Sequence, residues 1–227
     1  MKKHVTLFSS VLMMSTTLLG AGGVLAEEIT PNPASERTPV SAVLSIDTST
    51  VPTLPGDGSE GGHDNNNTEG AFGIAYQPKT LSGSKQLVAS GADEISLSHN
   101  SAEKLHVGVK DLTRKKHAWD LKASVSWDGD NSQYMTGATI DISGGKVQKN
   151  VDGNLSALDN AEVTGESNVS ISSDAKRIMS SDGSKTTNAI YDYEFSEAKL
   201  KIPNAENVPA GTYSGNINWD LSITPTY

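Results

Sequence analysis

The sequence predicts an all-β fold, either an antiparallel β-sandwich or a partly closed β-barrel, preceded by a disordered N-terminal tether. Short runs of residues alternate between apolar and polar side chains, and no window shows a long apolar stripe at helical spacing. Turn-forming pairs separate the runs, for example Asp128-Gly129 and Gly144-Gly145. Several short strands with such turns between them are typical of sandwiches and barrels.

The N-terminus has the pattern of a secretory signal peptide. Lys2 and Lys3 form a basic start, residues 5–25 are uncharged, and Val24-Leu25-Ala26 resembles a cleavage site. The alternative is a retained membrane anchor, which needs about 20 apolar residues. The uncharged stretch contains several Ser, Thr and Gly residues, which disfavour an anchor. We therefore expect a signal peptide over residues 1–26 and an exported mature protein.

The mature chain is expected to hold a short tether and one domain. Residues 27–37 combine prolines with charged residues and lack an apolar period, which predicts a disordered tether. The β domain is then expected over residues 38–227. Alternation over residues 40–47 predicts its first strand, and the Gly-, Asp- and Asn-rich stretch 52–70 predicts a mobile loop.

Composition excludes several classes of function. The chain has 18 basic and 27 acidic residues and a net charge of −9, which disfavours non-specific binding to nucleic acid. It has no cysteine, so disulfides and thiolate metal sites are excluded. The C-terminus shows no apolar tail and no sorting signal, so we expect neither a transmembrane segment after processing nor covalent attachment to the wall. An acidic protein is also repelled by an anionic cell wall, so if this protein stays on such a wall, specific contacts must hold it there.

Further strands are expected where Val, Ile or Leu alternates with polar residues. These runs cover residues 94–98, 104–110, 139–143, 168–172 and 199–202. Pro203 ends the last run, because proline cannot donate to a strand ladder.

The two strongest strands carry the same tripeptide. From Trp119 to Trp127 the odd positions are apolar and the even positions polar, and the run from Tyr213 to Ile223 repeats this arrangement apart from Gly215. Both runs contain Trp-Asp-Leu, at residues 119–121 and 219–221. Alternation favours tryptophans in the core, whereas the alternative is a groove for glycan or peptide lined by tryptophans. Trp127 lies at a strand end and could be a rim residue.

With both motifs in place, the chain resembles a WxL-domain cell-surface protein of low-GC Gram-positive bacteria. That family carries two Trp-x-Leu motifs, one in the middle of the domain and one near the C-terminus. The flanking segments 107–114 and 208–213 and the pair Phe72-Gly73 also resemble the family's pattern. Ala118 stands where the family has glycine, which is a mild departure.

The resemblance implies non-covalent attachment to the Gram-positive cell wall, with peptidoglycan as the ligand. It also implies a membrane-anchored WxL-interacting protein, other WxL proteins and a host matrix protein as partners. The alternative function is a structural or adhesive subunit of a surface complex, whose main ligand is such a partner. The motif residues expected to serve wall binding are Trp119, Asp120, Leu121, Trp219, Asp220 and Leu221.

No pattern of catalytic or metal-binding residues accompanies the motifs. The sequence lacks a nucleophile elbow, a phosphate-binding glycine loop and a helical pair of zinc-ligating histidines. Asp128 begins a calcium-like loop, but Gln133 and Thr139 stand where that loop needs Gly and Glu, which leaves a simple turn. The sequence therefore predicts a protein that is not an enzyme and needs no cofactor or metal.

One basic cluster precedes the first motif. Arg114, Lys115 and Lys116 form either a solvated turn or a contact for wall phosphates and peptide-stem carboxylates. Together with Trp127 they are the expected additional wall contacts.

Overall fold

The computed structural model describes residues 30, 32, 34–56, 62–66, 69–99 and 104–224. The predicted signal peptide lies outside these residues. The chain divides into two compact units, Met1–Val43 and Leu44–Tyr227. The described residues of the first unit are exposed and without regular secondary structure.

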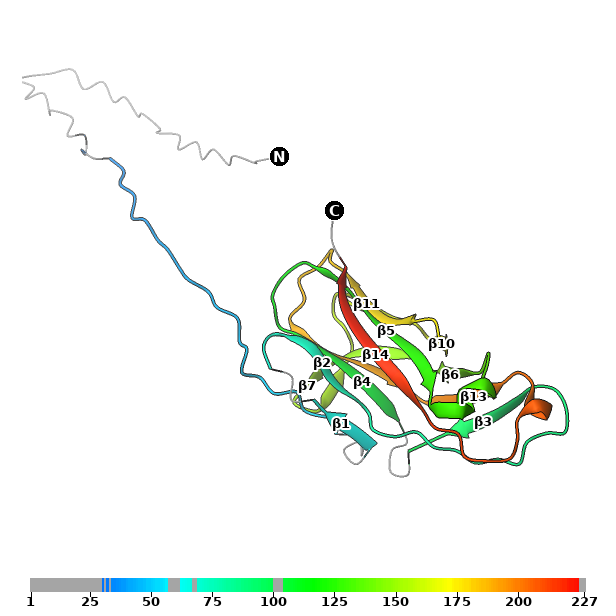
Figure 1. The fold of residues 1–227 in the computed structure, drawn as a ribbon. Coiled ribbons are helices and arrows are strands. Elements are labelled where there is room, and N and C mark those ends of the chain that lie inside the picture. The colour runs from blue at the N-terminus through cyan, green and yellow to red at the C-terminus, as the bar shows by residue number, and fades with distance from the viewer. Residues whose placement is uncertain are drawn as a thin grey trace, which may run out of the picture. The chain divides into compact units, whose positions relative to one another are not determined.

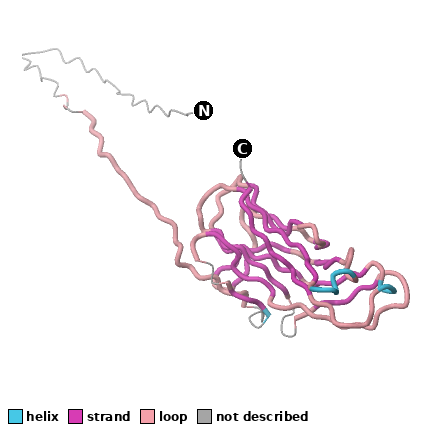
Figure 2. The backbone as a smooth tube through the Cα atoms, viewed as in Figure 1, coloured by secondary structure: helices cyan, strands magenta, loops and turns pink. Residues whose placement is uncertain are grey.

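The second unit is an all-β domain of three antiparallel sheets, which confirms the predicted fold class (Figures 1 and 2). The six-stranded sheet has the order β1 (His63–Asn65), β2 (Phe72–Pro78), β4 (Leu105–Asp111), β12 (Ala189–Phe195), β7 (Lys146–Val151) and β8 (Asn154–Ser156). A four-stranded sheet has the order β10 (Asn168–Ile171), β6 (Thr139–Ser143), β13 (Glu197–Ile202) and β3 (Asp93–Leu97). The other four-stranded sheet, named the motif sheet below, has the order β14 (Gly215–Thr224), β5 (Ala118–Trp127), β11 (Lys176–Asp182) and β9 (Thr164–Gly165).

One hydrophobic core joins the three sheets. Each sheet contributes the buried side chains of alternate positions, as a strand with one inward face requires. The fully buried members include Trp119, Leu121, Val107, Tyr193 and Ile171. Two short 3₁₀ turns, η2 (Gly129–Gln133) and η3 (Ala205–Asn207), lie over a smaller second cluster that includes Met135 and Val208.

The six-stranded sheet is covered on its other face by residues 50–56, which we call the strap. Lys110 is fully buried and donates to the carbonyl of Thr50 at 2.5 Å, and Asn150 donates to that of Thr53 at 2.7 Å. The amide of Gly56 donates to the carbonyl of Gly153 at 2.8 Å.

The strap corrects part of the expected mobile loop over residues 52–70. Pro52, Pro55 and His63 are buried, and His63 begins strand β1, so the described parts of this stretch belong to the folded domain. Polar composition predicted a loop here, but the buried side chains of Lys110 and Asn150 donate hydrogen bonds to backbone carbonyls of the strap and hold it in place. Residues 57–61 and 67–68 lie outside the described residues.

A buried polar network lies under the strap. Asp192 accepts from the Tyr76 hydroxyl at 2.8 Å and contacts His106 Nδ1 at 3.0 Å, while Asn150 donates to the Tyr76 hydroxyl at 2.9 Å. Burial raises the pKa of the Asp192 carboxyl, and the hydrogen bond with His106 opposes that rise. His63 accepts from the backbone amide of His106 at 2.8 Å, which connects β1 to the same network.

The expected first strand over residues 40–47 is wrong. This segment has no strand pairing, and Val40, Val43 and Leu44 are almost fully exposed. Alternation alone cannot form a strand, because a ladder needs a neighbouring strand to pair with.

Among the described residues, no helix has the length and apolar character to cross a membrane.

Candidate functional site

The two Trp-Asp-Leu tripeptides lie side by side on the motif sheet. β14 pairs antiparallel with β5 along its whole length, and Figure 1 shows the two strands adjacent. Leu121 is directly opposite Leu221, so the tripeptides run in opposite directions around this pair. Trp119 pairs with Ile223, and Trp219 pairs with Ala123. Because side chains alternate along a strand, both tryptophans are on the inner face and both motif aspartates on the outer face.

The first motif is built into the core. Trp119 is 0% exposed, and its indole Nε1 donates to Asp111 Oδ2 at 3.0 Å. Asp111 is also fully buried and accepts from the Thr113 hydroxyl at 2.7 Å. The indole packs near Phe72 and Tyr191, with ring centroids 6.3 Å away in each case. A ligand on the surface of this structure therefore cannot touch Trp119.

The second motif lies at the edge of the sheet. β14 pairs only with β5 among the described residues, so its other side offers unpaired backbone groups. Trp219 and Leu221 are half-buried and pack against the core, whereas Ile223 is 59% exposed. The second motif is therefore the more accessible of the two.

The outer face of the motif sheet is polar and carries the motif aspartates. Asp120 lies 3.9 Å from Lys122 on the same strand, and Lys122 is directly opposite the exposed Asp220 on β14. On its other side Lys122 is opposite Arg177 of β11. A row of three charged side chains, one anionic (Asp220) and two cationic (Lys122 and Arg177), thus crosses the sheet.

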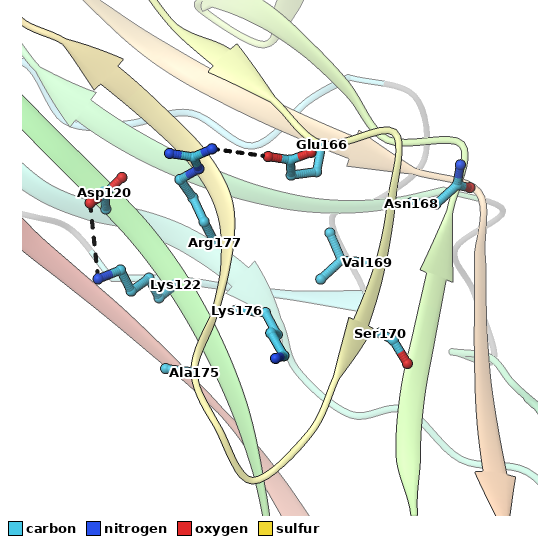
Figure 3. Close-up of a pocket in the computed structure, with 9 residues that line it drawn as sticks. All are labelled: Asp120, Lys122, Glu166, Asn168, Val169, Ser170, Ala175, Lys176 and Arg177. Carbon is cyan, nitrogen blue, oxygen red and sulfur yellow. Dashed lines mark hydrogen bonds and ion pairs between the residues drawn. The ribbon is translucent and has the colours of Figure 1, made fainter.

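A shallow hollow of about 600 Å³ opens beside this row, where β5 and β11 approach β10 (Figure 3). Its lining includes three cations, Lys122, Lys176 and Arg177, against two carboxylates, Asp120 and Glu166. The remaining lining residues are Asn168, Val169, Ser170 and Ala175.

The charges in the hollow are only partly paired. Arg177 lies 3.4 Å from Glu166 and Lys122 lies 3.9 Å from Asp120, as the dashed lines in Figure 3 mark. Lys176 has no ion-pair partner within the described part of the chain, and Figure 3 marks no interaction between its side chain and the other lining residues. The hollow therefore offers one uncompensated ammonium group beside amide and hydroxyl groups, a combination suited to a carboxylate or a phosphate.

A comparison with protein families identifies the family of this chain. The family described as WxL domain surface cell wall-binding matches residues 29–225. The chain belongs to this family. Its members bind the cell wall at the cell surface, which gives this protein the same location. No curated protein and no solved structure gave a significant match.

The basic cluster of this WxL domain is a separate surface. Arg114, Lys115 and Lys116 are exposed in the turn between β4 and β5 and do not line the hollow. Arg114 adopts a left-handed backbone with φ 54°, and the carbonyl of Lys115 accepts from the Thr187 hydroxyl at 3.2 Å. The turn is thus tied to the loop before β12, which fixes where its cations lie.

Trp127 lies at the far end of β5 from the basic cluster. It is half-buried and packs against both hydrophobic clusters, and its buried indole nitrogen has no hydrogen-bond partner among the described residues. It does not line the hollow.

The hollow contains cations that sequence analysis did not select. Alternation places Lys122 on the outer face, but β11 lacks clean alternation because a bulge shifts its register between Arg177 and Met179. The sequence pattern therefore did not place Lys176 and Arg177 on the outer face.

Among the described residues, no group of three or more His, Asp or Glu side chains is placed to hold a metal ion.

Proposed function

We propose that this WxL domain attaches non-covalently to the Gram-positive cell wall through peptidoglycan and catalyses no reaction. The observation that carries the proposal is the cationic hollow beside Asp120 on the motif sheet. The chain as a whole is acidic, with a net charge of −9, so a local excess of positive charge stands out as a contact for anionic groups.

Peptidoglycan offers groups that fit the hollow. Its peptide stems carry carboxylates and amines within a short distance of each other. The hollow is lined by side chains of both charges, which could pair with these groups. Lys176 would pair with a stem carboxylate, and Asn168 and Ser170 would bind neighbouring amide groups.

The motif residues then divide between two roles. Trp119 and Leu121 support the sheet from inside, whereas Asp120 lies 3.9 Å from Lys122 and Asp220 lies opposite Lys122 on the outer face. Trp219 and Leu221 lie at the accessible edge. Arg114, Lys115 and Lys116 would form a second contact with wall phosphates, and Trp127 would contribute only at the rim.

Sedimentation with purified peptidoglycan tests the proposal. The mature protein is expected to sediment, both with and without wall teichoic acid. The double variant Lys176→Glu/Arg177→Glu should weaken binding about tenfold or more, because hydrogen bonds to charged groups contribute about 1.5–3 kcal/mol. The matched control Lys146→Glu/Lys201→Glu changes the charge equally at exposed positions outside the hollow and should bind normally.

Equal binding by the two double variants would show that the hollow does not bind the wall. Failure of the wild type to sediment would show that peptidoglycan is not the ligand. Arg114→Glu/Lys115→Glu/Lys116→Glu tests the second contact, which should depend on teichoic acid. Release of sugars or amino acids from walls during the assay would contradict a non-enzymatic role.

The open edge of β14 favours a second candidate function. An edge strand with a half-exposed apolar face can accept a strand from another protein. The domain would then be a structural or adhesive subunit, held by a membrane-anchored partner or a host matrix protein. In that case purified peptidoglycan should capture little protein, whereas membranes that contain the partner should capture much.

A further inference from the structure

A small neutral pocket lies at the end of the domain that carries the two 3₁₀ turns, which Figure 2 shows in cyan near β13 and β3 of Figure 1. We call it the amide pocket. Its volume is about 270 Å³, and its lining is Gln133, Tyr134, Thr136, Ile202, Pro203, Asn204 and Asn207. None of these residues is Asp, Glu, Lys, Arg or His, in contrast to the hollow on the motif sheet.

The walls of the amide pocket are held by the second hydrophobic cluster. Met135 and Ala138 on one side, and Ala205 and Val208 on the other, are buried together beneath it. The amide of Ala138 donates to the carbonyl of Met135 at 3.0 Å, and the amide of Val208 donates to that of Ala205 at 3.1 Å. The segment that follows η2 and the turn η3 are therefore each closed by a backbone hydrogen bond.

A third segment supports the turn that carries the asparagines. The amide of Ala205 donates to the carbonyl of Gly91 at 2.9 Å, and the amide of Gly91 donates to the Glu206 carboxylate at 2.9 Å. These two hydrogen bonds hold the start of η3, directly after Asn204, against Gly91.

The three amide side chains of the pocket are not used by the fold, whereas the Thr136 hydroxyl donates to the carbonyl of Gln133 at 3.0 Å. Asn204 stands at the position before η3 where an asparagine usually accepts a hydrogen bond from the helix, yet it makes no such bond. A cap of this kind contributes about 1 kcal/mol, so its absence leaves the Asn204 amide available at some cost in stability. The side-chain amides of Gln133 and Asn207 likewise have no hydrogen-bond partner within the described residues.

Tyr134 adds an aromatic surface to these amides. Its side chain is 39% exposed, and its ring meets that of Tyr213 edge to face, with centroids 6.4 Å apart and planes at 84°. The Tyr213 hydroxyl donates to the carbonyl of Pro209 at 2.6 Å, which fixes the supporting ring. An aromatic side chain held in this way can stack against the apolar face of a ligand ring whose edge carries polar groups.

The combination selects a neutral, ring-shaped, hydrogen-bonding ligand. Each primary amide offers one acceptor and two donors, which match hydroxyl and acetamido groups. A phosphate or carboxylate would find no cation among the lining residues. The volume lies just below the range of about 300–1,000 Å³ filled by drug-sized ligands, so the pocket fits a single ring and not a long chain.

We propose that the amide pocket binds one residue of a neutral saccharide, an N-acetylhexosamine. Tyr134 stacks against the sugar ring, and Gln133, Asn204 and Asn207 bind its hydroxyl and acetamido groups. The glycan strands of peptidoglycan contain such sugars, so the inference deepens the proposed wall attachment and rests on it for the source of the ligand. The hollow on the motif sheet and the amide pocket would then bind the peptide and sugar parts of one polymer.

Titration of the mature protein with the trimer of N-acetylglucosamine tests this site. NMR should show saturable shifts of the side-chain amide signals of Asn204 and Asn207, with a Kd on the order of 1 mM, as expected for a few hydrogen bonds. Tyr134→Ala and Asn204→Ala/Asn207→Ala should each weaken binding about tenfold, because each removes several contacts. The matched control Asn168→Ala removes an amide from the hollow and should leave binding of the trimer unchanged.

Several outcomes separate this inference from the proposed function. Absence of saturable shifts, or equal affinity in Tyr134→Ala, would overturn the sugar site even if the protein sediments with peptidoglycan. Binding of the trimer without sedimentation would support the sugar site and contradict wall attachment, and would leave a glycan outside the wall as the source. Equal binding of a glucose trimer would show that the acetamido group is not recognised and would overturn the N-acetylhexosamine assignment.

Discussion

The two Trp-Asp-Leu tripeptides have the same residues but different environments. On β5 the tryptophan is fully buried and its indole nitrogen is bound by Asp111, whereas on β14 the tryptophan is half-buried. The difference follows from sheet order, because β5 has neighbours on both sides and β14 has one. A repeated motif therefore does not imply a repeated role: the first motif stabilises the domain, and the second lies where another molecule can reach it.

The largest expected effect is on the first tryptophan. Trp119→Ala should lower the free energy of unfolding by about 3–5 kcal/mol, because it leaves a large cavity in the core. Trp219→Ala should cost about 1–2 kcal/mol, since this side chain is only partly buried. Urea denaturation of both variants measures the difference.

Trp119→Phe and Trp219→Phe give a second comparison if Trp119→Ala does not fold. The first should still be the more destabilising, because phenylalanine cannot donate to Asp111. Equal losses at the two positions would contradict the assignment of the first motif to the core.

A smaller effect is expected at Asp111. Asp111→Ala leaves the Trp119 indole nitrogen and the Thr113 hydroxyl without their acceptor, and an unsatisfied buried group costs about 1–3 kcal/mol. The control Asp220→Ala changes an exposed aspartate of the second motif and should alter stability by no more than about 0.5 kcal/mol. Thermal melts of the two variants should therefore differ clearly, and similar melting temperatures would show that the Asp111 contact contributes little.

The smallest effect concerns alkaline pH. Burial, together with the nearby Glu166 charge, raises the pKa of Tyr193 to about 12, and its hydroxyl donates to the carbonyl of Glu166 at 2.7 Å. The unfolded chain ionises this phenol near its ordinary value of about 10. Its contribution to stability is therefore fully present below about pH 10 and is lost as pH rises toward about 12.

Denaturation at pH 8 and pH 11 measures this loss. The wild type should lose on the order of 1 kcal/mol more than Tyr193→Phe over that interval. Tyr134→Phe, which changes an exposed ring at the amide pocket, should follow the wild type. An identical pH profile for Tyr193→Phe would mean that another group accounts for the alkaline loss.

Sequence periodicity predicted the strands that have one face in the core and one in solvent. β5 and β14 alternate cleanly, and the runs that became β3, β4, β6, β10 and β13 were also recognised. β12 was missed because it is buried on both faces, so its apolar residues surround Asp192 without a simple period. β11 was missed because a bulge interrupts its alternation.

The site was harder to predict than the fold. The motifs could be found from the repeated tripeptide, but Lys176 and Arg177 reach the hollow only because β11 pairs with β5. The acceptor for Trp119 is Asp111, which belongs to a different strand, and its identity depends on tertiary packing. The expected strand over residues 40–47 shows the opposite error, since a correct local pattern found no partner strand.

The pairing of β14 with β5 also sets the order of events as the protein is made. Thr224 bonds to Asp120, which lies 104 positions earlier in the chain, and all ten residues of β14 complete the same sheet. Contacts of such wide sequence separation form late in folding. A surface protein must cross the membrane before it reaches the wall, and until residues 215–224 have emerged on the outside, β5 lacks its neighbour on that side and the motif sheet cannot be completed.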